Sequence, residues 1–169
     1  MEETNKIAAL SNNIKKLSLV LFSGDFDKAI AAFTLASGAA AVGYEVNLFF
    51  TFWGLNIVKE KKGRRFLGKG ILTKIFGFLM GGFKNLPLSK MNFGGFSKTA
   101  MNYLMKKENV ATLPELIDAA IALKANFYAC EMSMIILGLK KEDFIAPIKE
   151  VLSVASFLDY SKNGQTLFI

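Results

Sequence analysis

Histidine is absent from this sequence of 169 residues, and cysteine occurs once, as Cys130. Without histidine there is no Ser-His-Asp or Cys-His catalytic arrangement, and no zinc site that needs an imidazole ligand. A single thiol forms neither an internal disulfide nor a CxxC metal or redox motif, so we expect no metal site. Residues 1–16 lack the apolar core of a secretory signal, and we expect a cytoplasmic protein. The chemistry that remains centres on one thiol.

Long apolar spans and nucleotide-binding motifs are also missing. The mean hydropathy is high, at +0.34. The longest uncharged run, residues 29–44, nevertheless consists mostly of small side chains and is shorter than the roughly 20 residues that a membrane-spanning helix needs. No GxGxxG motif follows the first apolar run, and Gly68-Lys69-Gly70 lacks the spacing of a phosphate-binding loop. We therefore expect no cofactor and no nucleic-acid partner.

Apolar runs alternate with helical patterns along most of the chain. Residues 17–22 and 45–52 predict buried strands on either side of an alanine-rich helix, residues 27–42, which Gly43 ends. Each strand is a continuous apolar run, which is typical of a parallel sheet covered on both faces. The sequence predicts one α/β domain, a flavodoxin-like three-layer sandwich with about five parallel strands. Its later elements are a helix at 98–107, a helix opened by a Thr112–Glu115 capping box, a strand at 126–130, a helix at 131–137, a helical turn at 141–146, a strand at 148–152, a helix at 155–162 and a last buried strand at 166–169.

Residues 62–97 differ in composition from the rest of the chain. They contain eight glycines, clustered lysines and arginines, and many aromatic and aliphatic side chains, and much of the net charge of +7 lies in and beside them. We interpret this stretch as a lid-like insertion into a single domain spanning residues 1–169, with residues 1–16 as an N-terminal extension. Such a segment is suited to covering a pocket, packing against another subunit, or making a peripheral contact with an acidic membrane surface.

Three strand-to-helix turns are expected to meet at one edge of the sheet. Right-handed connections place all such turns beyond the carboxyl ends of the strands, where open α/β sheets bind their ligands. The turns are residues 23–25, 51–54 and 130–133. They bring Cys130 together with candidate pocket residues, which are Ser23, Gly24, Asp25, Trp53, Met132 and Ser133.

Each candidate also has a structural interpretation. The free N–H groups at the start of the helix after Cys130 favour a thiolate, whereas Glu131 opposes one, and a free cysteine is often simply a small buried hydrophobic residue. Asp25 suits a helix N-cap as well as a ligand contact. Trp53 suits a pocket wall or packing on the sheet, and Met132 suits a pocket lining or core filling.

Four segments carry a resemblance to a known family. They are residues 22–55 (FSGDFDKAIAAFTLASGAAAVGYEVNLFFTFWGL), 86–95 (LPLSKMNFGG), 129–139 (ACEMSMIILGL) and 154–169 (VASFLDYSKNGQTLFI). In this order they resemble the DsrE/DsrF/DrsH-like proteins, in particular the subgroup called peroxiredoxin-like. The resemblance implies a flavodoxin-like fold, a homo-oligomer, and a cysteine that carries sulfane sulfur as a persulfide or a thiosulfonate. Cys130 matches that cysteine. The implied donors and acceptors are rhodanese-like or flavin-dependent disulfide reductase-like proteins.

Two functions from different classes follow. The first is a sulfurtransferase-type sulfur carrier, in which the Cys130 thiolate attacks a sulfane donor and passes the sulfur to an acceptor thiol. The second is a noncatalytic interaction module, which docks on a partner protein or a membrane through the basic insertion while Cys130 stays buried and inert. Accessibility of the native thiol separates the two.

Overall fold

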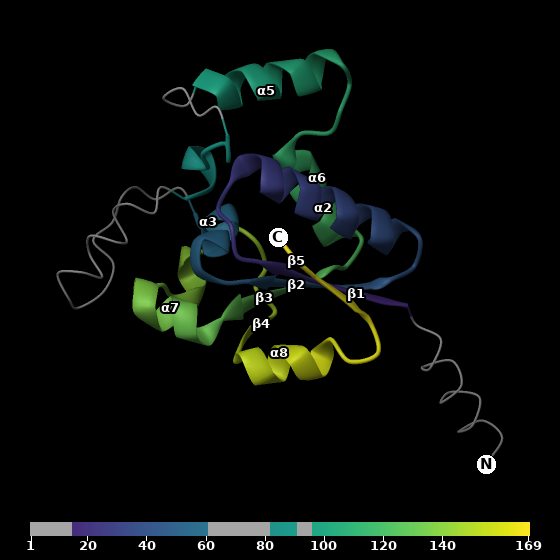
Figure 1. The fold of residues 1–169 in the computed structure, drawn as a ribbon, viewed down its shortest axis with the longest axis vertical. Coiled ribbons are helices and arrows are strands. Elements are labelled where there is room, and N and C mark those ends of the chain that lie inside the picture. Colours follow the sequence, from purple (N-terminus) through teal and green to yellow (C-terminus); the bar gives the residue numbers. More distant parts are fainter. Residues whose placement is uncertain (1–14, 61–81, 91–95) are drawn as a thin grey trace.

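The computed structural model of the protein describes residues 15–60, 82–90 and 96–169. Within them, five strands form one parallel sheet in the order β4-β3-β2-β1-β5. Helices cover both faces, which confirms the predicted flavodoxin-like α/β sandwich (Figure 1). The strands are β1 (Lys16–Leu21), β2 (Glu45–Phe50), β3 (Asn126–Cys130), β4 (Glu150–Leu152) and β5 (Gln165–Phe168).

Helices lie on both faces of the sheet. Helix α2 (Phe26–Ala41) packs against α6 (Leu113–Ala122) on one face, and α8 (Val154–Tyr160) lies on the opposite face (Figure 1). The other α-helices among the described residues are α3 (Leu55–Val58), α5 (Phe96–Lys107) and α7 (Glu131–Leu137). No helix in the part of the chain that the structure describes has the length and apolar character to cross a membrane.

Local sequence signals explain how α2 and α6 begin and end. The α2 helix ends where Gly43 adopts a φ of +84°, a conformation that glycine tolerates at no steric cost. At the start of α6, the Glu115 carboxylate accepts hydrogen bonds from the backbone N–H and the hydroxyl of Thr112, both at 2.7 Å. The hydrogen bond from the Thr112 backbone N–H to the Glu115 side chain, which the expected capping box requires, is therefore present.

The sheet separates two hydrophobic clusters of unequal size. Alternate residues of a strand point to opposite faces, so Phe127 and Ala129 join the large cluster beneath α2 and α6. Tyr128 and Cys130 join a small cluster beneath α8, together with Phe49, Leu152 and Phe157. Phe157 anchors α8, because its ring stacks on Phe49 with centroids 4.4 Å apart.

Several predicted elements differ from the structure. The helical turn expected at 141–146 is a 3-10 turn at Lys141–Asp143, and the strand expected at 148–152 is shortened to Glu150–Leu152. The last strand was expected to be buried, but all four residues of β5 are exposed and none belongs to either hydrophobic cluster; β5 lies at the edge of the sheet and pairs only with β1. The second strand was expected to extend to Phe52, but β2 ends at Phe50. Phe52 instead takes a φ of +45° and opens a 3-10 turn at Phe52–Gly54, which breaks the strand.

Part of the predicted insertion lies against the start of α2. The backbone N–H of Phe26 donates to the carbonyl of Pro87 at 2.7 Å. Ser89 donates to Asp27 twice, from its N–H at 2.9 Å and from its hydroxyl at 2.5 Å. Residues 82–90 are thereby fixed next to the carboxyl edge of the sheet. The remainder of the insertion up to residue 95 and residues 1–14 lie outside the described residues.

Candidate functional site

The three turns predicted to converge are joined by hydrogen bonds. The N–H of Gly54 donates to the carbonyl of Phe22 at 2.8 Å, which ties the turn after β2 to the turn after β1. The hydroxyls of Thr51 and Ser133 lie 2.9 Å apart in a buried hydrogen bond, which ties the turn after β2 to α7. The prediction that these turns meet at the carboxyl edge of the sheet is confirmed.

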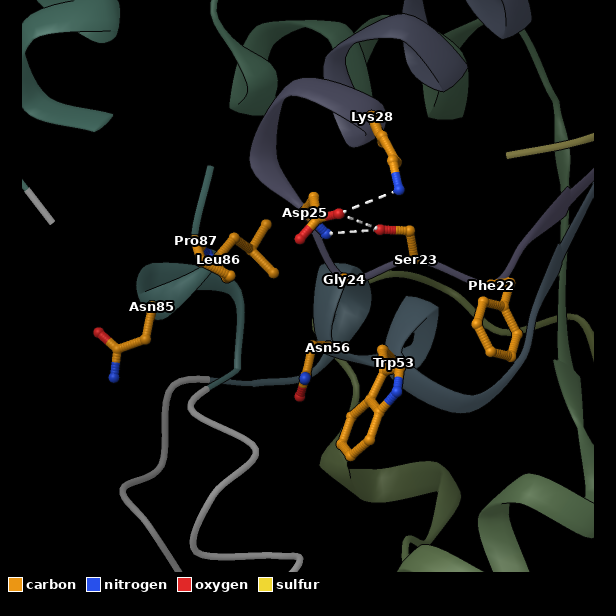
Figure 2. A pocket seen from close by; sticks show the side chains of 10 residues that line it. All are labelled: Phe22, Ser23, Gly24, Asp25, Lys28, Trp53, Asn56, Asn85, Leu86 and Pro87. Atoms are coloured by element: carbon orange, nitrogen blue, oxygen red, sulfur yellow. Dashed lines mark hydrogen bonds and ion pairs between the residues drawn. The ribbon is translucent and has the colours of Figure 1, made fainter. Parts of the chain in front are cut away.

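A cavity of about 460 Å³ opens at this edge. Ser23, Asp25 and Lys28 lie on one side of it, Trp53 and Asn56 on another, and a segment of the predicted insertion faces them (Figure 2). Its lining contains four of the predicted pocket residues. The complete lining is Phe22, Ser23, Gly24, Asp25, Lys28, Trp53, Asn56, Asn85, Leu86 and Pro87.

The polar wall of the cavity is a short hydrogen-bonded network. The Ser23 hydroxyl donates to Asp25 Oδ2 at 2.7 Å and accepts from the Asp25 backbone N–H at 3.1 Å. Lys28 Nζ lies 3.2 Å from the same Asp25 oxygen (Figure 2). Asp25 occupies the N-cap position of α2, but its side chain makes no capping hydrogen bond. Asp25 is therefore the N-cap residue by position, as expected, but its carboxylate is held by Ser23 and Lys28 and does not cap the helix.

Gly24 is required by a close approach of two backbones. A Cβ atom at this position would lie 2.7 Å from the carbonyl oxygen of Trp53, which is closer than side-chain carbons approach other atoms. The absence of a side chain lets the turn after β1 contact the turn after β2. The Trp53 side chain remains 41% exposed, so it forms a wall of the cavity instead of packing within the core.

Six lining residues were not among the predicted candidates: Phe22, Lys28, Asn56, Asn85, Leu86 and Pro87. The Oδ1 atom of Asn56 is buried and accepts no hydrogen bond, which is uncommon for a native protein. Nothing in the local sequence marks Asn56, which sits in the short buried helix α3. Asn85, Leu86 and Pro87 reach the cavity only because residues 82–90 dock on α2, a long-range contact that carries no local signal.

Cys130 does not line this cavity. It is the last residue of β3 and the N-cap residue of α7, with an extended backbone. Its side chain is 1% exposed and belongs to the cluster beneath α8, and it is not among the residues that line the cavity. The neighbouring Glu131 is exposed. The structure therefore places the thiol at the predicted edge of the sheet, but on the face that α8 covers, where it is buried.

The two other candidates on α7 are also separate from the cavity. Ser133 is fully buried and hydrogen bonded to Thr51, so it fixes the first turn of α7. Met132 is half exposed, at 50%, and does not fill the core. Among residues 15–60, 82–90 and 96–169, no group of three or more acidic, cysteine or histidine side chains is placed to hold a metal ion.

Comparison with known proteins assigns the chain to a family. The DsrE/DsrF/DrsH-like family model matches residues 13–169. The uncharacterized protein YrkE of Bacillus subtilis is 41% identical over 162 residues, which cover 95% of this chain and all of that protein. The sulfur carrier protein DsrE2 of Allochromatium vinosum is 32% identical over 149 residues, which cover 87% of this chain and 92% of that protein. From the length of these matches, the chain belongs to the DsrE/DsrF/DrsH-like family.

Proposed function

We propose that this protein is a sulfur carrier and that Cys130 is the residue that carries the sulfur. The observation that supports this most is the likeness to a protein named as a sulfur carrier over 149 residues, in a chain with a single thiol. That thiol ends β3, at the edge of a parallel sheet where α/β proteins place their reactive groups.

The proposed chemistry is exchange at sulfur without net oxidation. The Cys130 thiolate attacks the outer sulfur of a donor persulfide R–S–S⁻; a new S–S bond forms on Cys130 as the donor's S–S bond breaks and the thiolate R–S⁻ leaves. A donor of the form R–S–S–SO₃⁻ gives a thiosulfonate on Cys130 by the same exchange. An acceptor thiolate then attacks the transferred sulfur and releases the Cys130 thiolate.

The burial of Cys130 requires a movement before either step. Helix α8 has seven residues and contributes Phe157 to the buried cluster that contains the thiol, while Val154 and Leu158 of the same helix are at least half exposed. We infer that α8 moves away when a donor or acceptor protein docks. The exposed apolar side chains of α7, which are Met132, Ile135 and Ile136, offer that protein a surface beside Cys130.

The test is mass spectrometry of the intact native protein after incubation with polysulfide and with thiosulfonate donors. We expect an adduct that contains transferred sulfur, that is removed by a reducing thiol, and that maps to Cys130. Cys130→Ser is the matched control and should remain unmodified. If the wild type remains unmodified with every donor, the sulfur-carrier proposal is wrong.

One observation favours the second candidate, a noncatalytic interaction module. Cys130 is buried as an inert core cysteine would be, at 1% exposure. Alkylation of the native protein near neutral pH distinguishes the two functions. Labelling of the folded protein favours the carrier, and labelling only after denaturation favours the module.

A further inference from the structure

A second cavity, of about 370 Å³, lies between the start of α2, helix α5 and the start of α6. It shares no described lining residue with the cavity at the edge of the sheet. Cavities of this volume are within the range of small-molecule sites, and an apolar cavity of about 150 Å³ already holds benzene. The second cavity therefore has room for a ring together with a polar group.

One row of side chains on α5 supplies most of the polar part of the lining, and Thr112 at the start of α6 supplies the rest. Lys98, Asn102 and Lys106 are spaced four residues apart, so they lie on the same face of the helix. Two ammonium groups and one carboxamide thus face the same space. All three side chains carry N–H donors, which suit a ligand rich in acceptor oxygens.

The apolar part of the lining comes from Phe26, Phe83 and Pro114. Lys98 joins the two parts, because its Nζ lies 5.2 Å from the centroid of the Phe26 ring and 3.4 Å from the carbonyl oxygen of Phe83. Burial lowers the pKa of Lys98, which indicates an ammonium group that has lost part of its hydration. An anion in the cavity would add to the stabilisation that the Phe83 carbonyl and the Phe26 ring already give this ammonium group.

The lining carries positive charge without a carboxylate among its described residues. Glu115 lies close enough to interact with Lys106, and its carboxylate accepts the N–H and the hydroxyl of Thr112 at the start of α6. Glu115 is thus engaged by the helix that it caps.

We propose that this cavity binds a small organic anion: a phosphate, sulfonate or carboxylate joined to an apolar group the size of one aromatic ring. The oxygens of the anion contact Lys98 and Lys106, and the ring lies against Phe26, Phe83 and Pro114. The site does not depend on Cys130 or on the proposed sulfur transfer.

The experiment is titration of the full chain with phenyl phosphate, followed by calorimetry and by amide chemical shifts. Loss of one charged hydrogen bond costs about 1.5–3 kcal/mol, so we expect Lys106→Gln to weaken binding about tenfold or more. The matched control is Lys107→Gln, which removes an exposed charge from the same helix turn but not from the cavity. It should change the affinity less than about twofold, the effect expected of a screened surface charge.

Two further ligands complete the test. Inorganic phosphate lacks the ring and phenol lacks the charge, so each should bind at least about tenfold more weakly than phenyl phosphate. If Lys106→Gln and Lys107→Gln weaken the binding of phenyl phosphate equally, the proposal is overturned, because the ligand would then be attracted by the general positive charge of the surface. Equal affinity for phosphate and phenyl phosphate would also overturn it. Lys106 is exposed, so its variant should fold.

Discussion

The rate at which a thiol reagent reaches Cys130 reports directly on the proposed opening of α8. The side chain is 1% exposed, so labelling of the native protein requires an opening of the structure. If that opening is the departure of α8, it breaks the stacking of Phe157 on Phe49 at 4.4 Å and leaves the large cluster beneath α2 intact. The labelling rate then follows the equilibrium constant of this local opening.

Phe157→Ala should therefore accelerate labelling strongly. Truncation of a buried phenylalanine costs about 3–5 kcal/mol. The open state has already lost the contacts of Phe157, so the substitution destabilises only the closed state. The free energy of opening therefore falls by the full amount, and labelling of Cys130 should become at least about 100-fold faster. The assay is the reaction of the native protein with a chromogenic disulfide, compared with the denatured chain as the upper limit. Leu158→Ala on the exposed side of α8 should change the rate less than about twofold.

A substitution far from α8 tests whether Cys130 becomes accessible by local opening or by global unfolding. Phe33 is fully buried on the opposite face of the sheet, in the large cluster. Phe33→Ala should lower the free energy of global unfolding by a similar amount and leave the labelling rate unchanged. If it accelerates labelling as much as Phe157→Ala, the thiol becomes accessible only through global unfolding. If Phe157→Ala has no effect, α8 does not control access.

Three other predictions concern stability. Burial, with smaller contributions from nearby Tyr160 and carboxylates, raises the pKa of Tyr128 to about 12. Because this folded-state pKa exceeds the unfolded value of about 10, the free energy of unfolding should fall as pH rises from 10 towards 12. Tyr128→Phe should reduce that fall, as measured by denaturant titrations. Gly24→Ala should destabilise the protein by about 1–3 kcal/mol in denaturant unfolding, because its Cβ would lie 2.7 Å from the Trp53 carbonyl oxygen. Partial burial acts to raise the pKa of Asp27, but two hydrogen bonds from Ser89 hold it below its ordinary value. Ser89→Ala should therefore cost about 1 kcal/mol near neutral pH, an amount reduced by solvent exposure. The difference in stability between the wild type and Ser89→Ala should disappear as the pH falls below about 4 and Asp27 becomes protonated, because its pKa in the folded state is lowered. Calorimetric melting at several pH values measures this difference.

The central framework of the fold could be predicted because its signals are local. Residues 126–130 form a strand and 131–137 a helix with the predicted bounds, since a short apolar run and a following amphipathic segment are visible in the sequence itself. The edge position of β5 was not visible, because an apolar run of four residues has the same composition in the centre of a sheet and at its edge. Burial of such a run depends on the elements that pack against it and not on its own composition.

The candidate site was predicted in part for the same reason. Parallel topology brings the turns together, and this rule places Ser23, Gly24 and Trp53 around one cavity. The alternation of side chains in β3 puts Tyr128 and Cys130 on one face, but only tertiary packing shows that this face is covered by α8. The role of Asp25 depended on competition between a backbone N–H, Ser23 and Lys28, which sequence spacing does not decide.

The two hydrophobic clusters differ greatly in size, and Cys130 lies in the smaller one. On the proposed mechanism, the stability of the fold and the rate of sulfur transfer then depend on different sets of residues. Improvements in packing between α2 and α6 would raise the melting temperature without slowing the delivery of sulfur. Conversely, changes to the few aromatic contacts beneath α8 would adjust the speed of the carrier with little risk to the rest of the molecule.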